Sequence, residues 1–232
     1  MQVSNKTEKL IIQLPEQRDY QYSLELAYKI ACEQIGRIQN IQGQCLKSDS
    51  DYQALNSRGI VTVQYLDCVY QITLPGINVS FQDSAAAVPL RDKIMVLHYF
   101  IQSKGTPVSG RWVTYKDFPE GVVYFPTFYK RAIIPWLERF GQCPEKLLDA
   151  ARTLRGQRID FGSIGVVIPA FKRVPVALVL WHGDEEFPSE GNILFDGSIS
   201  DYLTTDDINM LCQTIAWRLV KSAQEDDNLG RK

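Results

Sequence analysis

The longest apolar run of the chain, residues 174–181, constrains the fold more than any other feature. Within it, residues 176–180 read Val-Ala-Leu-Val-Leu without a break, which is typical of a β-strand covered on both faces. The run is less than half as long as a membrane-spanning helix requires. It therefore predicts a central strand of a sheet with other elements packed against it.

Hydrophobic periodicity predicts helices and further strands on both sides of this run. Apolar residues at helical spacing indicate the helices, and alternating or short apolar runs indicate the strands. The expected helices cover about 20–38, 90–103, 127–140, 144–154 and 204–222, and the expected strands cover 61–65, 70–74, 77–81, 111–115, 121–124, 164–168, 175–181 and 192–195. Pro135 predicts a kink or an early break near Arg131.

The order of these elements lacks the strict βαβ alternation of a doubly wound sheet. We therefore expect an α+β fold, a single compact domain with a mixed or antiparallel sheet flanked by about five helices. The domain is expected to span residues 20–222, after a loose leader over 1–19 and before a frayed charged tail over 223–232. Residues 44–58, rich in Ser, Asp and Asn, are expected to form a polar linker.

Charge and cysteine spacing argue against several function classes. The 25 basic and 27 acidic side chains give a formal net charge of −2, so we expect no nucleic-acid partner, which usually requires a clustered basic face. The five cysteines contain no CxxC pair, which indicates free thiols in a reducing compartment and no metal site. With no signal-peptide core and no membrane-length run, the sequence predicts a soluble cytoplasmic protein without a membrane partner.

His182 is the candidate for acid–base chemistry, because only histidine titrates near neutral pH without help. It follows the apolar run directly and begins a polar loop that contains Asp184 and Glu185. In an enzyme, His182 would act as a general base paired with Glu185 or Asp184. A polar surface turn is the alternative interpretation. His98 lies on the apolar side of a predicted helix, which is typical of a core histidine with one satisfied nitrogen.

Two further groups of polar residues are candidates for ligand binding. Residues 196–201 place oxygen-bearing side chains at alternate positions, with Asp196 and Asp201 at the ends. Asp201 stands where a calcium loop needs glycine, and hydrogen bonds that cap the loop are the other interpretation. Lys130 and Arg131 follow a cluster of aromatic residues, a combination that can hold a planar ligand by stacking and charge.

Several segments of the chain share their sequence with a known family. They include Pro-Leu-Arg-Asp, Tyr-Phe-Pro and Trp-His-Gly-Asp-Glu-Glu-Phe-Pro, and they cover residues 89–99, 105–107, 124–126, 130–132, 181–188 and 192–196. Together they resemble the DUF3786 family of bacterial and archaeal proteins, over about residues 20–220. The resemblance implies one compact domain and no established activity. Some members carry a cysteine-rich segment that looks like an iron–sulfur module, which implies a setting in anaerobic redox or corrinoid metabolism; this chain lacks that segment.

These candidates lead to one leading prediction and two alternatives. The leading prediction is an intracellular ligand- or cofactor-binding accessory protein, whose small-molecule ligand is not identified, with a pocket near His182, Asp184, Glu185, Asp196 and Asp201. One alternative is an enzyme based on His182, which predicts a concave and partly buried site. The other is a protein-interaction or oligomeric module that uses the aromatic segment 124–136, which predicts an exposed apolar patch. The oligomeric state and the cofactor stay open.

Overall fold

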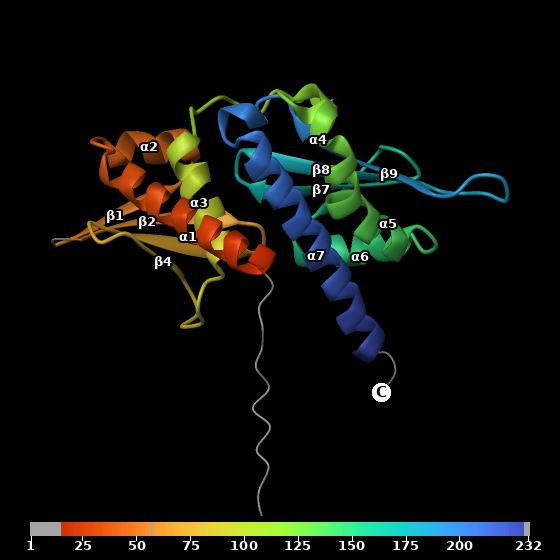
Figure 1. Ribbon diagram of the computed structural model, residues 1–232, viewed down its shortest axis with the longest axis horizontal. Helices are drawn as coiled ribbons and strands as arrows, with labels where there is room; N and C mark the ends of the chain where they lie inside the picture. Colours follow the sequence, from red (N-terminus) through yellow and green to blue (C-terminus); the bar gives the residue numbers. More distant parts are fainter. Residues whose placement is uncertain (1–14, 57, 230–232) are drawn as a thin grey trace, which may run out of the picture.

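Two antiparallel β-sheets with helices packed against them make up the fold (Figure 1). The computed structural model describes residues 15–229 apart from residue 57. The strands of the first sheet have the order β1-β2-β3-β4, and those of the second have the order β5-β9-β8-β7-β6. The expected α+β class is confirmed, and the expected single sheet is in fact two.

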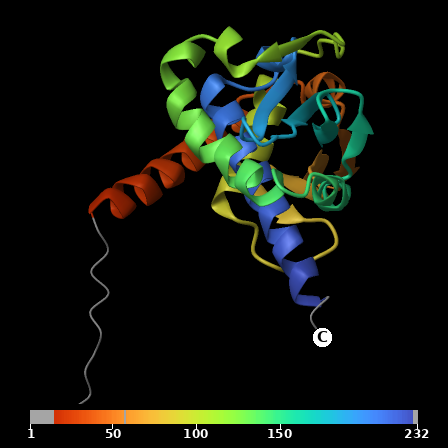
Figure 2. The same ribbon diagram turned by 90° about the vertical axis from the view of Figure 1, so that its right-hand side faces the viewer.

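Residues 15–102 form the first half of the molecule. Its elements are α1 (Pro15–Gly36), α2 (Ile41–Ser48), β1 (Asp51–Leu55), β2 (Arg58–Tyr65), β3 (Cys68–Leu74), β4 (Asn78–Phe81) and α3 (Leu90–Gln102). The predicted hairpin is confirmed as β2 and β3, because Val61, Val63 and Tyr65 alternate inward. Helix α3 is buried on most sides, and α1 packs along it. In Figure 2 the N-terminal part of α1 extends away from the body.

The expected polar linker over residues 44–58 is wrong, since most of it is helix or strand. Helix α2 begins after Asn40, whose side-chain Oδ1 accepts the N–H of Gly43 at 2.8 Å. Strand β1 pairs with β2 at the edge of the sheet and is exposed on both faces, so its sequence carries no apolar alternation. Helix α1 begins at Pro15, inside the expected leader; residues 1–14 lie outside the described residues.

Residues 112–229 form the second half. Its elements are β5 (Trp112–Thr114), a 3-10 turn (Tyr115–Asp117), α4 (Gly121–Phe128), a π-helical segment (Tyr129–Ile133), α5 (Ile134–Phe140), α6 (Glu145–Thr153), β6 (Gln157–Ile159), β7 (Ile164–Phe171), β8 (Val174–Trp181), β9 (Glu190–Asp196), a 3-10 turn (Ile199–Asp201) and α7 (Thr205–Leu229). Strand β8 pairs with β7 and β9 and is almost entirely buried, as the apolar run predicts. No helix among the described residues is long and apolar enough to cross a membrane.

The strand expected over residues 121–124 is wrong, since Gly121 begins helix α4. Val122 and Val123 favour a strand by propensity, but both are exposed, and none of the described strands pairs with them. The expected irregularity near Arg131 is confirmed: the α-helical pattern is interrupted there by the π-helical segment, which ends shortly before Pro135. Proline lacks the N–H that would bond to the preceding turn, so a wider turn accommodates it.

Helix α7 continues to Leu229, through most of the tail that was expected to be frayed. Its last turns are held by Asp227, which pairs with Arg139 of α5 and with Lys146 of α6 at 2.9 Å. Residues 230–232 lie outside the described residues. In Figure 1, α7 runs between the first half and helices α5 and α6.

The two halves meet through an aromatic core. Phe171 of β7 stacks on Tyr99 of α3, with ring centroids 3.9 Å apart, and on Tyr65 of β2, with centroids 4.8 Å apart. Leu66, fully buried in the β2–β3 turn, donates its backbone N–H to the carbonyl oxygen of Ala170 at 2.8 Å. The buried residues of both halves therefore form one continuous core, and the two sheets belong to one domain.

Candidate functional site

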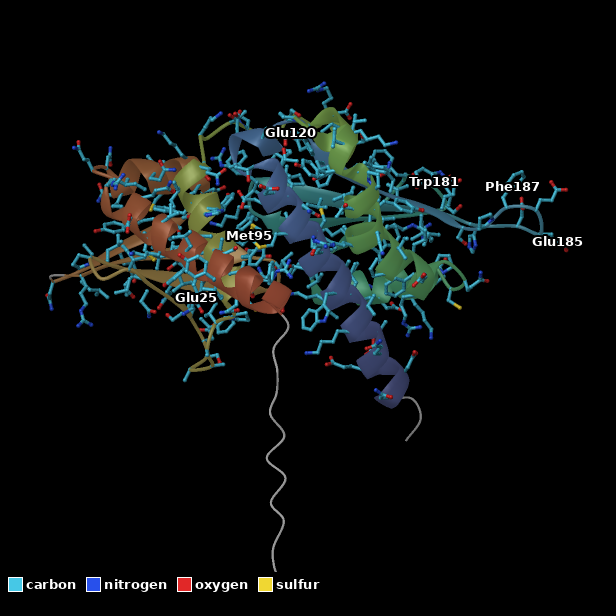
Figure 3. The ribbon with its side chains drawn as sticks, viewed as in Figure 1. Glu25, Met95, Glu120, Trp181, Glu185 and Phe187 are labelled. Atoms are coloured by element: carbon cyan, nitrogen blue, oxygen red, sulfur yellow. The ribbon has the colours of Figure 1, made fainter. Side chains whose placement is uncertain are left out.

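The loop that follows β8 places His182 at an exposed position. The Asp184 carboxylate accepts the backbone N–H groups of Glu186 at 2.9 Å and Phe187 at 2.8 Å, which lowers its pKa. Glu185 is exposed at the tip, and Figure 3 shows Glu185 and Phe187 projecting beyond the body of the protein. A hollow of about 120 Å³ beside His182 is too small for most organic ligands. The role of His182 stays a prediction.

Asp196, at the end of β9, is 1% exposed and fully hydrogen-bonded. Its carboxylate accepts the backbone N–H and hydroxyl of Ser109, the N–H of Gly110, and the N–H and hydroxyl of Ser198, at 2.6–3.1 Å. Burial by itself would raise the pKa of Asp196, but these hydrogen bonds outweigh it and lower the pKa to about 2. Asp196 therefore fastens the loop of Ser109 to the end of β9.

Asp201 fastens the same connection at its other end. Its carboxylate accepts the Nζ of Lys104 at 2.8 Å and the hydroxyl of Thr106 at 2.7 Å, and these bonds lower its pKa. Residues 103–111 are the link between the two halves. The sequence of residues 196–201 allowed a calcium-like loop or loop-capping hydrogen bonds. The observed contacts of Asp196 and Asp201 are of the second kind.

The structure does not bring His182 and Asp196 together. Trp181 pairs with Glu190 at one end of the β8–β9 hairpin, whereas Asp196 ends β9 beyond the pairing of Phe195 with Val176. At about 3.3 Å per residue the two ends are roughly 20 Å apart. Within the described part of the chain, no group of three or more His, Cys, Asp and Glu side chains is arranged to hold a metal ion.

The other predicted binding residues lie on the π-helical segment. Lys130 and Arg131 are exposed, and neither side chain makes an ion pair or hydrogen bond with any described residue. Of the neighbouring aromatic residues, Phe128 and Trp136 are fully buried, whereas Tyr124 is half exposed. Segment 124–136 thus packs one side into the core and leaves its other side exposed or half-buried.

A larger cavity than the hollow beside His182 lies between the two halves. It has a volume of about 590 Å³ and opens to solvent. Its walls come from the β2–β3 turn, the end of β4, the first turn of α3, the end of α6 and the middle of α7. The charged groups in these walls come from both halves, and they are Asp67, Arg91, Asp92, Arg218, Lys221 and Glu225.

Arg218 of α7 lines this cavity and bonds to the two acidic cavity residues that come from the first half. It donates to Asp92 of α3 at 2.9 Å and to Asp67 in the β2–β3 turn. The hydroxyl of Tyr70 also donates to Asp92, at 2.9 Å. Burial alone would lower the pKa of Arg218, but the two carboxylates outweigh it and raise the pKa. The guanidinium therefore holds α7 against the first half as a permanent cation.

Arg91, Trp217 and Lys221 also line the cavity. The Nη2 of Arg91 lies 3.5 Å from Oε1 of Gln213, and its Nε is buried without a hydrogen-bond partner. Trp217 is 61% exposed, and the Nζ of Lys221 lies 5.2 Å from its ring centroid. A flat aromatic face and two cations thus point to the same space.

No residue of this cavity was among the predicted site residues. Arg218 pairs with partners 126 and 151 positions away, and no local pattern reveals such pairs. One signal was available: Arg91 and Asp92 belong to the Pro-Leu-Arg-Asp segment that carries the family resemblance. A second signal was an arginine at position 218, directly beside the apolar face of the last helix.

The fold and the cavity define a two-sheet α+β protein with a charged cleft where its halves meet. The chain belongs to the DUF3786 family, since the family described as a domain of unknown function (DUF3786) matches residues 45–218. The match includes both sheets and the cavity residues as far as Arg218. Neither a search of curated proteins nor a search of solved structures found a match.

Proposed function

We propose that the protein binds a small-molecule ligand in the cavity between its two halves. A volume of about 590 Å³ lies within the usual range of ligand sites, roughly 300–1,000 Å³. Polar groups from three elements converge there, as they do in sites that fix the orientation of a ligand. This cavity is the observation that carries the proposal.

The walls of the cavity support a preformed site. Arg218 is bonded on both sides, so its guanidinium is held in place before any ligand arrives. Tyr70 is fully buried behind Asp92, and burial together with the charge of Asp92 raises its pKa. Its hydroxyl therefore stays protonated and keeps donating to the carboxylate. A site that needs little reordering loses less free energy on binding.

The proposal keeps the predicted class of function, a ligand-binding protein. It places the site in the cavity between the halves instead of near His182 and Asp196. The redox or corrinoid setting that the family resemblance implies adds flavins and corrinoids to the test panel. Ligand in excess stabilises the folded state, by about 2.7 kcal/mol at a hundred times its Kd. A binding compound should therefore raise the Tm measurably.

The experiment is a thermal-shift screen of wild type against two tryptophan variants. The panel contains nucleotides, flavins, corrinoids, sugar phosphates and organic acids. Ser222→Trp places an indole in the cavity wall, and Gln224→Trp places the same group on an exposed position of the same helix. We expect a compound whose shift is lost in Ser222→Trp and kept in Gln224→Trp. A panel without any shift, or shifts equal in both variants, contradicts the proposal.

A further inference from the structure

The charged groups in the cavity are unevenly satisfied. Arg218 bonds to both Asp67 and Asp92, so each of these two carboxylates has a cationic partner. Of the other two cations of the cavity, Lys221 pairs only with the exposed Glu225, and Arg91 has no carboxylate within 4.0 Å among the described residues. The charges in the cavity walls are balanced in number, and the charge that lacks a partner of opposite sign is the guanidinium of Arg91.

Arg91 lacks a partner that comparable arginines have. Among the described residues, three arginines bury an Nε without a hydrogen bond: Arg91, Arg139 and Arg173. Arg139 and Arg173 each lie within 4.0 Å of a carboxylate, and Arg91 does not. The one side-chain hydrogen bond of Arg91 to a described residue, to Gln213, is long at 3.5 Å. Buried donors are nearly always bonded, so an acceptor supplied by a ligand would complete this group.

Lys221 and Trp217 extend the same surface toward solvent. The Nζ of Lys221 lies 3.8 Å from Glu225, and both side chains are more than half exposed, so the pair neutralises little charge. Trp217 exposes 61% of its surface beside that ammonium group. An exposed indole at the rim of a cavity offers a flat face for stacking.

We propose that the ligand of this cavity is a small organic anion with a flat ring system. This inference rests on the proposed function and names the class of ligand. Arg91 donates to the carboxylate or phosphate of the ligand, for which a guanidinium is well shaped. Lys221 adds a second positive charge, and the ring lies against Trp217.

The test uses probes in chemically matched pairs. Each pair shares a flat ring and differs in one anionic group: adenosine monophosphate and adenosine, flavin mononucleotide and riboflavin, naphthoate and naphthamide. Isothermal titration calorimetry with the full chain measures the Kd of each. The first two pairs report on phosphate and the third on carboxylate. We expect the anion of at least one pair to bind roughly tenfold more tightly, as a charged hydrogen bond allows.

Matched variants connect this preference to the cavity. Arg91→Gln and Lys221→Gln each remove one charge from it, whereas Arg158→Gln and Lys29→Gln remove the same charges from exposed positions on β6 and α1. We expect the preference for the anion to fall in the first two variants and to persist in the others. Arg91→Lys should restore part of it. An unchanged Tm shows that each variant is folded.

The outcomes separate this inference from the proposed function. Equal affinity within every pair, an unchanged preference in Arg91→Gln, or no binding by any probe overturns the anion class. A neutral probe whose binding is lost in Ser222→Trp leaves the proposed function standing and overturns the anion class. Binding of an anion that survives Ser222→Trp lies outside the cavity and contradicts both.

Discussion

The Nδ1 of His98 lies 2.6 Å from Oδ1 of Asp207, which joins helix α3 to the first turn of α7. Asp207 also closes a capping box: its carboxylate accepts the N–H and hydroxyl of Thr204, whose oxygen accepts the N–H of Asp207. Burial alone would raise the pKa of Asp207, but hydrogen bonds from His98 and its other partners lower it. The carboxylate is therefore ionised, and Nδ1 of His98 carries the proton it donates.

Replacing Asp207 by alanine removes the cap and the link between α3 and α7 together. We expect the free energy of unfolding to fall by about 2–4 kcal/mol, the combined effect of a lost cap and a lost charged hydrogen bond. Urea denaturation measures the change. Asp206→Ala is the matched control, because Asp206 is exposed in the same turn, and it should change stability by less than about 1 kcal/mol. Similar losses in both variants contradict the role given to Asp207.

Stability should fall in acid because Asp196 has a depressed pKa. A carboxylate whose pKa is lower in the folded state stabilises the fold above its unfolded pKa and stops doing so as pH falls through the folded one. For Asp196 this window runs from its ordinary value of 3.8 down to about 2. The contribution at neutral pH is about 2 kcal/mol.

The measurement compares wild type with Asp196→Asn by urea denaturation across that pH range. The difference in unfolding free energy should be full at neutral pH and shrink as the pH falls from about 4 toward 2. A difference that stays constant with pH would show that the charge of Asp196 does not stabilise the fold.

Removing Arg218 should leave Asp92 buried without its cation. We expect Arg218→Ala to lower the free energy of unfolding by about 3–5 kcal/mol, the usual effect of breaking a buried ion pair. Lys221→Ala, one turn further along α7, removes an exposed pair and should change it by less than about 1 kcal/mol. A double-mutant cycle with Asp92→Asn isolates the coupling between the two groups. Coupling near zero argues against Arg218 as the bond between the halves.

Phe171 connects the cores of the two halves, so replacing it should destabilise the fold and weaken the coupling between the unfolding of the two halves. Phe171→Ala should reduce the unfolding free energy by about 3–5 kcal/mol. Phe161→Ala, at a position 37% exposed, should have a smaller effect. Differential scanning calorimetry should give one transition for wild type, in keeping with a single domain. Two separate transitions in wild type would contradict a continuous core.

Most of the fold follows from local sequence patterns, and the exceptions have a common cause. The run at 174–181 and the alternation at 61–65 report burial directly, and both became strands as expected. Strand β1 and helix α4 went unrecognised because their exposure is set by neighbours distant in sequence. Residues 121–124 have strand propensity, but without a partner strand at that edge they formed a helix.

Which polar residues come together in space depends on the order and direction of the strands and helices. The local sequence patterns did not determine that topology. His182 and Asp196 are 14 positions apart in the sequence, but the antiparallel hairpin between them places them at opposite ends of the sheet. Arg91 and Arg218 are far apart in sequence and line one cavity. The polar residues at the two ends of the β8–β9 hairpin thus lie apart, whereas the charged residues beside the apolar face of α7 line the cavity.

The connection over residues 103–111 has a consequence for biosynthesis. Among the described elements the chain passes from one half to the other once, so each half is a continuous stretch of sequence. The ribosome completes α3 and the first sheet well before it reaches α7, the last described element. Until then Asp67 and Asp92 have no guanidinium to bind, and one wall of the cavity does not exist. The nascent chain must therefore keep this surface in solution through the synthesis of about half of the protein before the ligand site can form.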